Sequence, residues 1–173
     1  ADFGSAGRRW LGHVDVPDLA LLPERVPGVR TVRFQAGLEV SLFHLGLWIA
    51  SWPVRAGLVG NLAPLSSALL AVKRRLHFLG SDRGGMTVEL RGTGHDGQSK
   101  SLRWLLEAGQ GHGPYVPVLT AVALAKRLLA GAETRRGASA CDALVPLPDI
   151  LAQADGLDIR ATTYEKSPPL RMR

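Results

Sequence analysis

Residues 86–108, MTVELRGTGHDGQSKSLRWLLEA, carry the strongest fold signal in this sequence. Apolar and polar residues alternate in two runs on either side of an Asp96-Gly97 pair. The apolar members are Met86, Val88 and Leu90 before the turn, and Leu102, Trp104 and Leu106 after it. A period of two places them on one face of each strand, and Asp-Gly favours a hairpin turn. The stretch therefore predicts a hairpin of two antiparallel strands.

The sequence after the hairpin predicts two helices and a last strand. A helix is expected over about 117–130, where Gly131 ends it. Its apolar stripe comprises Val118, Ala121, Val122, Ala125, Leu128 and Leu129. A short helix is expected over 148–154 and a strand over 157–162. The polar end, 164–173, is expected to be a loose tail.

The sequence before the hairpin also contains alternating runs. One predicts a strand over 30–36, and a shorter strand is expected over 10–16, closed by Pro17. Residues 23–27 are expected to form a loop. Strands in pairs with helices between them indicate an α+β fold, with one mixed, mainly antiparallel sheet and helices packed on one face.

Residues 40–72 form a long apolar stretch in which Arg55 is the only charged residue. Helices are expected over 40–54 and about 62–79, the second with a stripe of Leu62, Leu65, Leu69, Val72, Leu76 and Leu79. Prolines and glycines such as Pro53 interrupt the stretch, which argues against a membrane-spanning segment. The sequence leaves open whether 40–72 belongs to the core, to a dimer interface or to a membrane-facing surface.

Composition and charge exclude several classes of function. The chain has 173 residues, 46% of them apolar and 21% charged, which predicts one globular domain. Its formal charge of +6 is spread out and Lys73-Arg74-Arg75 is the only dense basic run, so no nucleic-acid partner is expected. The single Cys141 allows no internal disulfide, and the histidines lack metal-site spacing. We therefore expect no metal and a reducing, cytoplasmic location.

Two glycine-flanked polar loops supply the candidate binding residues. The loop 80–86 contributes Ser81, Arg83, Gly84 and Gly85, and the loop 109–114 contributes His112 and Gly113. Arg83 can bind a carboxylate bidentately, and free N–H groups at the following helix start can hold an anion. Because the loops adjoin the two ends of the hairpin, they are expected to share one cleft for an anionic substrate group. The competing interpretation is structural for both loops. The loop 109–114 would be a simple turn with His112 facing solvent, and the loop 80–86 would be a helix cap with a surface Asp82–Arg83 pair.

Neither loop completes a dinucleotide-binding fingerprint. Counting G-x-G-x-x-G from Gly109 places Pro114 at the third glycine position, where a helix must approach its strand closely. No cofactor is therefore expected to bind this chain.

The order of several motifs resembles the C-terminal domain of saccharopine dehydrogenase-like oxidoreductases, over about residues 8–161. The motifs are Trp10 with Val14-Asp15-Val16-Pro17, Ala36-Gly37-Leu38-Glu39, the Gly80-to-Met86 loop, Gly92 with Asp96-Gly97, the Gly113-Pro114 helix start, the Ala125-to-Gly131 helix end, and Gly137-Ala138 before Cys141. In that family an N-terminal Rossmann domain binds NAD or NADP. The second domain covers the nicotinamide, contributes substrate contacts and often forms a dimer.

The resemblance implies that residues 1–173 are a single substrate-binding and oligomerisation domain, cut from a parent whose Rossmann domain is missing here. The parent would transfer hydride with NAD(P), act on a small anionic substrate and form a homodimer, while the chain alone would be inactive. The resemblance does not identify catalytic residues or the substrate. The alternative is a non-catalytic module that binds a membrane surface or a protein partner through 40–72.

Overall fold

The computed structural model describes residues 1–135, 137, 140 and 143–166. Cys141, Ala138 and the tail beyond Lys166 lie outside the described residues. The chain divides into two compact units, one made of Ala1–Asp2 with Arg8–Ser81 and the other of Phe3–Gly7 with Asp82–Arg173. Helices and antiparallel strands together give the predicted α+β fold. That the whole chain acts as one domain stays a prediction.

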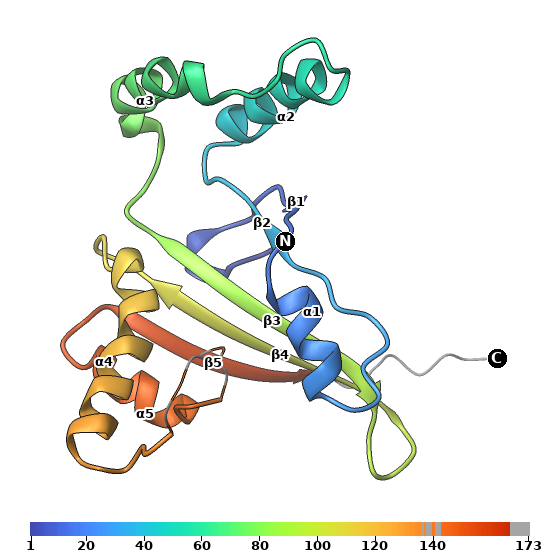
Figure 1. Ribbon diagram of the computed structural model, residues 1–173, viewed down its shortest axis with the longest axis vertical. Coiled ribbons are helices and arrows are strands. Elements are labelled where there is room, and N and C mark those ends of the chain that lie inside the picture. Colours follow the sequence, from blue (N-terminus) through green and yellow to red (C-terminus); the bar gives the residue numbers. More distant parts are fainter. Residues whose placement is uncertain (136, 138–139, 141–142, 167–173) are drawn as a thin grey trace. The chain divides into compact units, whose positions relative to one another are not determined.

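The second unit is built on an antiparallel sheet in the order β3-β4-β5 (Figure 1). The strands are β3 (Gly84–Thr93), β4 (Ser99–Ala108) and β5 (Ile159–Lys166). Met86 pairs with Leu106 and Val88 with Trp104, so the predicted apolar residues share one face, which confirms the hairpin. Strand β5 runs further than the predicted 157–162. The loose-tail prediction is therefore wrong for residues 164–166, because this part pairs with the β4 residues 101–103.

Helices α4 (Val116–Leu129) and α5 (Leu147–Leu151) pack against each other beside this sheet (Figure 1). Both were predicted, but the stripe expected to face inward on α4 is wrong. The structure buries Leu119 and Ala123, whereas Leu128 is 51% and Leu129 is 89% exposed. Since α4 carries apolar residues on both sides, its periodicity alone does not select the buried face.

The core of the second unit is small. Its buried apolar side chains are Phe3, Ala6, Leu105, Leu106, Ala108, Leu119, Ala123 and Val145. Phe3 and Ala6 come from a 3-10 turn, Gly4–Ala6, which reaches the sheet from the start of the chain. A Cβ at Gly85 would press on Phe3, so the turn lies against the sheet face that odd-numbered β3 residues share.

The first unit contains β1 (Gly12–His13) paired with β2 (Gln35–Ala36), and the helices α1 (Asp18–Arg25), α2 (Ser41–Arg55) and α3 (Ser66–Arg75). The strands predicted over 10–16 and 30–36 are thus only two residues long. The loop predicted over 23–27 is wrong in its first part, because α1 includes Pro23. Pro17 has helical backbone angles, and it begins this helix instead of closing a strand.

Helices α2 and α3 confirm the two elements predicted in the apolar stretch, although α3 is shorter than 62–79. No residue of either helix is buried. Leu69 is 42% and Val72 48% exposed, so the stripe expected on α3 is not part of a core. Among the described residues, no helix combines the length and the apolar character that a bilayer crossing requires.

Candidate functional site

The two predicted glycine loops meet at one edge of the sheet. Gly84, the first residue of β3, pairs with Ala108, the last residue of β4. Beyond this pair, the Gly111 N–H donates a hydrogen bond of 3.1 Å to the Asp82 carbonyl oxygen. The prediction that both loops emerge at the same edge is confirmed.

A shallow hollow of about 270 Å³ lies at this edge, between the hairpin and the start of α4. Its lining residues are Gly84, Gly85, Met86, Leu106, Ala108, Gly113, Val116 and Pro117. Three of the six predicted site residues are among them: Gly84, Gly85 and Gly113. A Cβ at Gly84 or Gly113 would meet no atom within 4 Å, so these two glycines leave the hollow open. All the lining side chains are apolar, which suits an apolar group better than a carboxylate.

Arg83 contacts the 3-10 turn through the opposite face of the sheet. Its Nη1 lies 3.5 Å from the Ser5 carbonyl oxygen, to which it donates a hydrogen bond. Glu107, on the same face, accepts a hydrogen bond from the Ser5 backbone N–H. Hydrogen bonds from Ser5, assisted by the charges of Arg160 and Arg83, lower the pKa of Glu107. Arg83 thus shares a polar cluster with Glu107, whereas Met86 and Leu106 face the hollow.

His112 joins the turn after β4 to the segment that precedes β5. Its Nδ1 accepts a hydrogen bond of 2.8 Å from the Asp158 backbone N–H. The Gly109 N–H donates a hydrogen bond of 2.9 Å to the Asp158 carbonyl oxygen. The two hydrogen bonds therefore connect the turn after β4 to the backbone of Asp158. The Tyr115 ring meets the imidazole edge-on, with ring centroids 5.8 Å apart. Because Nδ1 accepts this hydrogen bond, Nε2 is the His112 nitrogen that can donate a hydrogen bond to a ligand.

Ser81 lies in the first unit, where it contacts Glu39. The Ser81 hydroxyl donates a hydrogen bond of 2.6 Å to Glu39 Oε1, and Arg9 forms an ion pair of 3.1 Å with the same oxygen. Burial acts to raise the pKa of Glu39, but the hydrogen bonds from Ser81 and the charge of Arg9 outweigh it and lower the pKa. Ser81, Arg83 and His112 therefore each have a protein partner. That these three residues together bind one anion stays a prediction.

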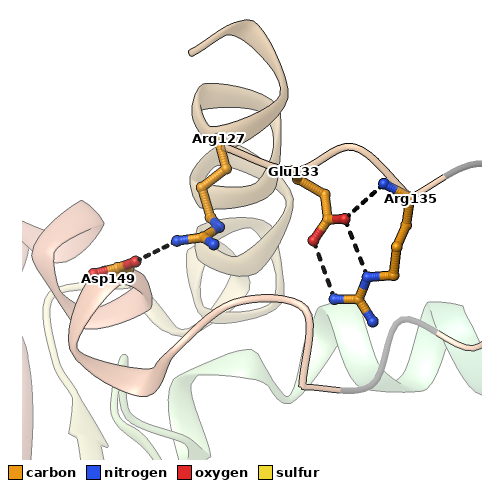
Figure 2. A network of polar contacts seen from close by, with 4 residues as sticks. All are labelled: Arg127, Glu133, Arg135 and Asp149. Carbon is orange, nitrogen blue, oxygen red and sulfur yellow. Dashed lines mark hydrogen bonds and ion pairs between the residues drawn. The ribbon is translucent and has the colours of Figure 1, made fainter. Parts of the chain in front are cut away.

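A polar network at the far end of α4 was not singled out by the sequence (Figure 2). Arg127 of α4 forms an ion pair of 3.2 Å with Asp149 of α5, and its buried Nε has no hydrogen-bond partner among the described residues. Glu133 accepts two hydrogen bonds from the Arg135 side chain and one from its backbone N–H. These bonds lower the pKa of Glu133 to about 2. The first pair connects the two helices and the second shapes the segment after α4, so the network has a structural role.

In the part of the chain that the structure describes, no three His, Cys, Asp or Glu side chains gather around a common point. Comparisons of the chain with protein-family models, curated proteins and solved structures found no match. Within the described residues, the hollow at the sheet edge is the candidate site that the geometry supports.

Proposed function

We propose that this chain is the substrate-binding domain of an oxidoreductase that resembles the saccharopine dehydrogenase-like enzymes. The observation that carries the proposal is the hollow at the sheet edge, which Gly84, Gly85 and Gly113 line together with apolar side chains. A glycine-rich hollow lets a ligand approach the backbone closely, as a domain that covers a reacting substrate requires. The resemblance in motif order, the α+β fold and this position of the glycines support the same function.

The domain contributes binding and orientation, and the parent's cofactor domain contributes the chemistry. This chain does not fit a dinucleotide, because its only fingerprint-like stretch has Pro114 where the third glycine is required. In the parent, a nicotinamide cofactor held by the Rossmann domain would supply the hydride in its reduced form, or accept it in its oxidised form. The residues of the hollow would then exclude water from an apolar part of the substrate. A cytoplasmic location and a homodimer belong to the same proposal.

The proposal is tested by calorimetry on the isolated chain and on its full-length parent. We expect the parent to bind NAD or NADP and the isolated chain to bind neither. Stoichiometric binding to the isolated chain at micromolar concentration, or no binding to the parent, would contradict the proposal.

The role of the hollow is tested in the parent by a Gly84→Leu substitution, which fills it. Activity is followed as NADPH oxidation across a panel of aldehydes, ketones and imines. The Michaelis constant for the organic substrate should rise at least tenfold, while that for the cofactor stays unchanged. Gly92→Leu is the matched control, because Gly92 lies near the opposite end of β3 and its Cβ would also meet open space. Equal effects of both substitutions would refute a binding role.

A further inference from the structure

Helix α2 presents an apolar stripe to solvent. Its members are Leu45, Trp48, Ile49 and Trp52, which are 45%, 57%, 62% and 58% exposed. They stand at positions i, i+3, i+4 and i+7 of the helix, so they share one face. The Trp48 and Trp52 rings meet edge-on, with centroids 5.6 Å apart. On the other side of the helix Phe43 and Val54 are less exposed, whereas Leu47 is 43% exposed.

Within residues 40–81 all formal charges have one sign. Residues 40–81 contain no Asp or Glu, and their formal charges are Arg55, Lys73, Arg74 and Arg75. Arg55 ends α2 itself, and the other three end α3. Exposed tryptophans on a helix that has no acidic residue and ends in Arg55 are typical of segments that lie in the interface of an anionic membrane.

We infer that the α2 stripe, with the basic residues that follow it, binds the surface of an anionic lipid bilayer. Helix α2 has 15 residues, fewer than the roughly 20 that a spanning helix needs, so it would lie in the plane of the interface. The tryptophan rings would enter the headgroup region, and the cations would contact lipid phosphates or carboxylates. This inference concerns a surface separate from the hollow and does not depend on the proposed oxidoreductase function.

A second copy of the chain is the competing occupant of the stripe. Two copies that met through α2 would offer each other no acidic residue from 40–81 to pair with Arg55 or with the basic residues of α3. An anionic lipid surface supplies the missing negative charge. Charge complementarity therefore favours lipid over self-association at this stripe.

Vesicle flotation tests the inference with the chain as it stands. The chain is mixed with vesicles of phosphatidylcholine alone, or of phosphatidylcholine with phosphatidylglycerol, at low and at high salt. We expect it to float only with the anionic vesicles and to be released at high salt. Flotation that is equal on both vesicle types, or absent on both, would overturn the inference.

Two double substitutions identify the residues responsible. Trp48→Ser with Trp52→Ser should lower partitioning at least tenfold. Lys73→Gln with Arg75→Gln should lower it about 25-fold, since each cation near an anionic surface contributes about a factor of five. All four side chains are exposed, so far-UV circular dichroism should show unchanged folding.

Matched controls use exposed residues of the same unit outside the stripe. Trp10→Ser removes a tryptophan that is 65% exposed, and Arg30→Gln with Arg33→Gln removes two exposed cations. Both controls should retain binding to anionic vesicles, and equal losses in controls and test variants would overturn the assignment. A dimer in analytical ultracentrifugation that Trp48→Ser with Trp52→Ser dissociates, without any vesicle binding, would assign the stripe to a second copy and also overturn it.

Discussion

Replacing Leu119 by Ala is the most direct test of how the second unit is packed. Leu119 of α4 is only 5% exposed. A buried Leu→Ala change loses the transfer free energy of the removed carbons and leaves a cavity, which costs about 2–5 kcal/mol. The buried core here is small and can partly collapse, so we expect a loss of about 3 kcal/mol. Leu129→Ala is the control, because Leu129 is 89% exposed and its loss should change stability by no more than about 0.5 kcal/mol.

Urea unfolding followed by Trp104 fluorescence measures this difference. Trp10, Trp48 and Trp52 are 65%, 57% and 58% exposed and can be replaced by Phe, which leaves Trp104 of β4 as the only tryptophan. With a slope of about 1–3 kcal/mol per molar urea, Leu119→Ala should lower the midpoint by about 1–3 M. Equal shifts in both variants would contradict the selective burial of Leu119, and a larger shift for Leu129→Ala would show that the stripe predicted from the sequence is the buried face.

Three further predictions concern single contacts. Glu133 should titrate at about 2, and Arg135→Gln should return it towards 4.5 in a carboxyl-carbon NMR titration; no change would refute the pairing. Gly37→Ala should destabilise the first unit by about 1–3 kcal/mol in thermal unfolding, because its Cβ would collide with the Trp10 carbonyl oxygen, whereas Gly46→Ala meets open space and should not. Since the folded-state pKa of Glu39 is lowered, its stabilising contribution should be complete above pH 4.5 and be lost as the pH falls; Arg9→Gln should weaken this dependence in acid titrations.

Local signals in the sequence were sufficient to predict the hairpin. Its alternation, its turn at Asp96-Gly97 and its pairing partner all lie within residues 84–108. The same holds for α2 and α5, whose lengths follow from short apolar runs. The alternation over 10–16 and 30–36 predicted strands that are longer than the observed ones. A strand also needs a hydrogen-bonded partner along its length, and here only two residues of each strand are paired.

Two errors have a common physical origin. Pro17 and Pro23 were interpreted as breakers, but Pro17 stands at the start of α1, where its missing N–H is not needed, and α1 continues through Pro23 to Arg25. On α4, apolar residues on both sides of the helix left the choice of face to tertiary packing, which buried Leu119 and Ala123. In both cases the local pattern allowed two structures, and packing selected one.

For the candidate site, the sequence predicted the backbone better than the side chains. The sequence predicted that Gly84 and Gly113 lie at the same edge of the sheet. In an antiparallel hairpin the start of the first strand and the end of the second are always neighbours. The partner of Arg83 could not be predicted in this way, since Ser5 lies 78 residues earlier in the chain. Likewise, Ser81 contacts Glu39, which is 42 residues away. Side-chain partners at such separations depend on the tertiary fold.

The two faces of the sheet differ in polarity at this site, and this difference affects the kind of ligand that each face can bind. Arg83 and Glu107 share one face, where each already contacts Ser5. The hollow lies on the other face and is lined by apolar side chains such as Met86 and Leu106. An anionic group bound by Arg83 would have to displace the Ser5 carbonyl and face the Glu107 carboxylate, whose lowered pKa favours the ionised form. An apolar group would enter the hollow without either cost, so under the proposed function a substrate with a hydrocarbon part would fit better than a small acid.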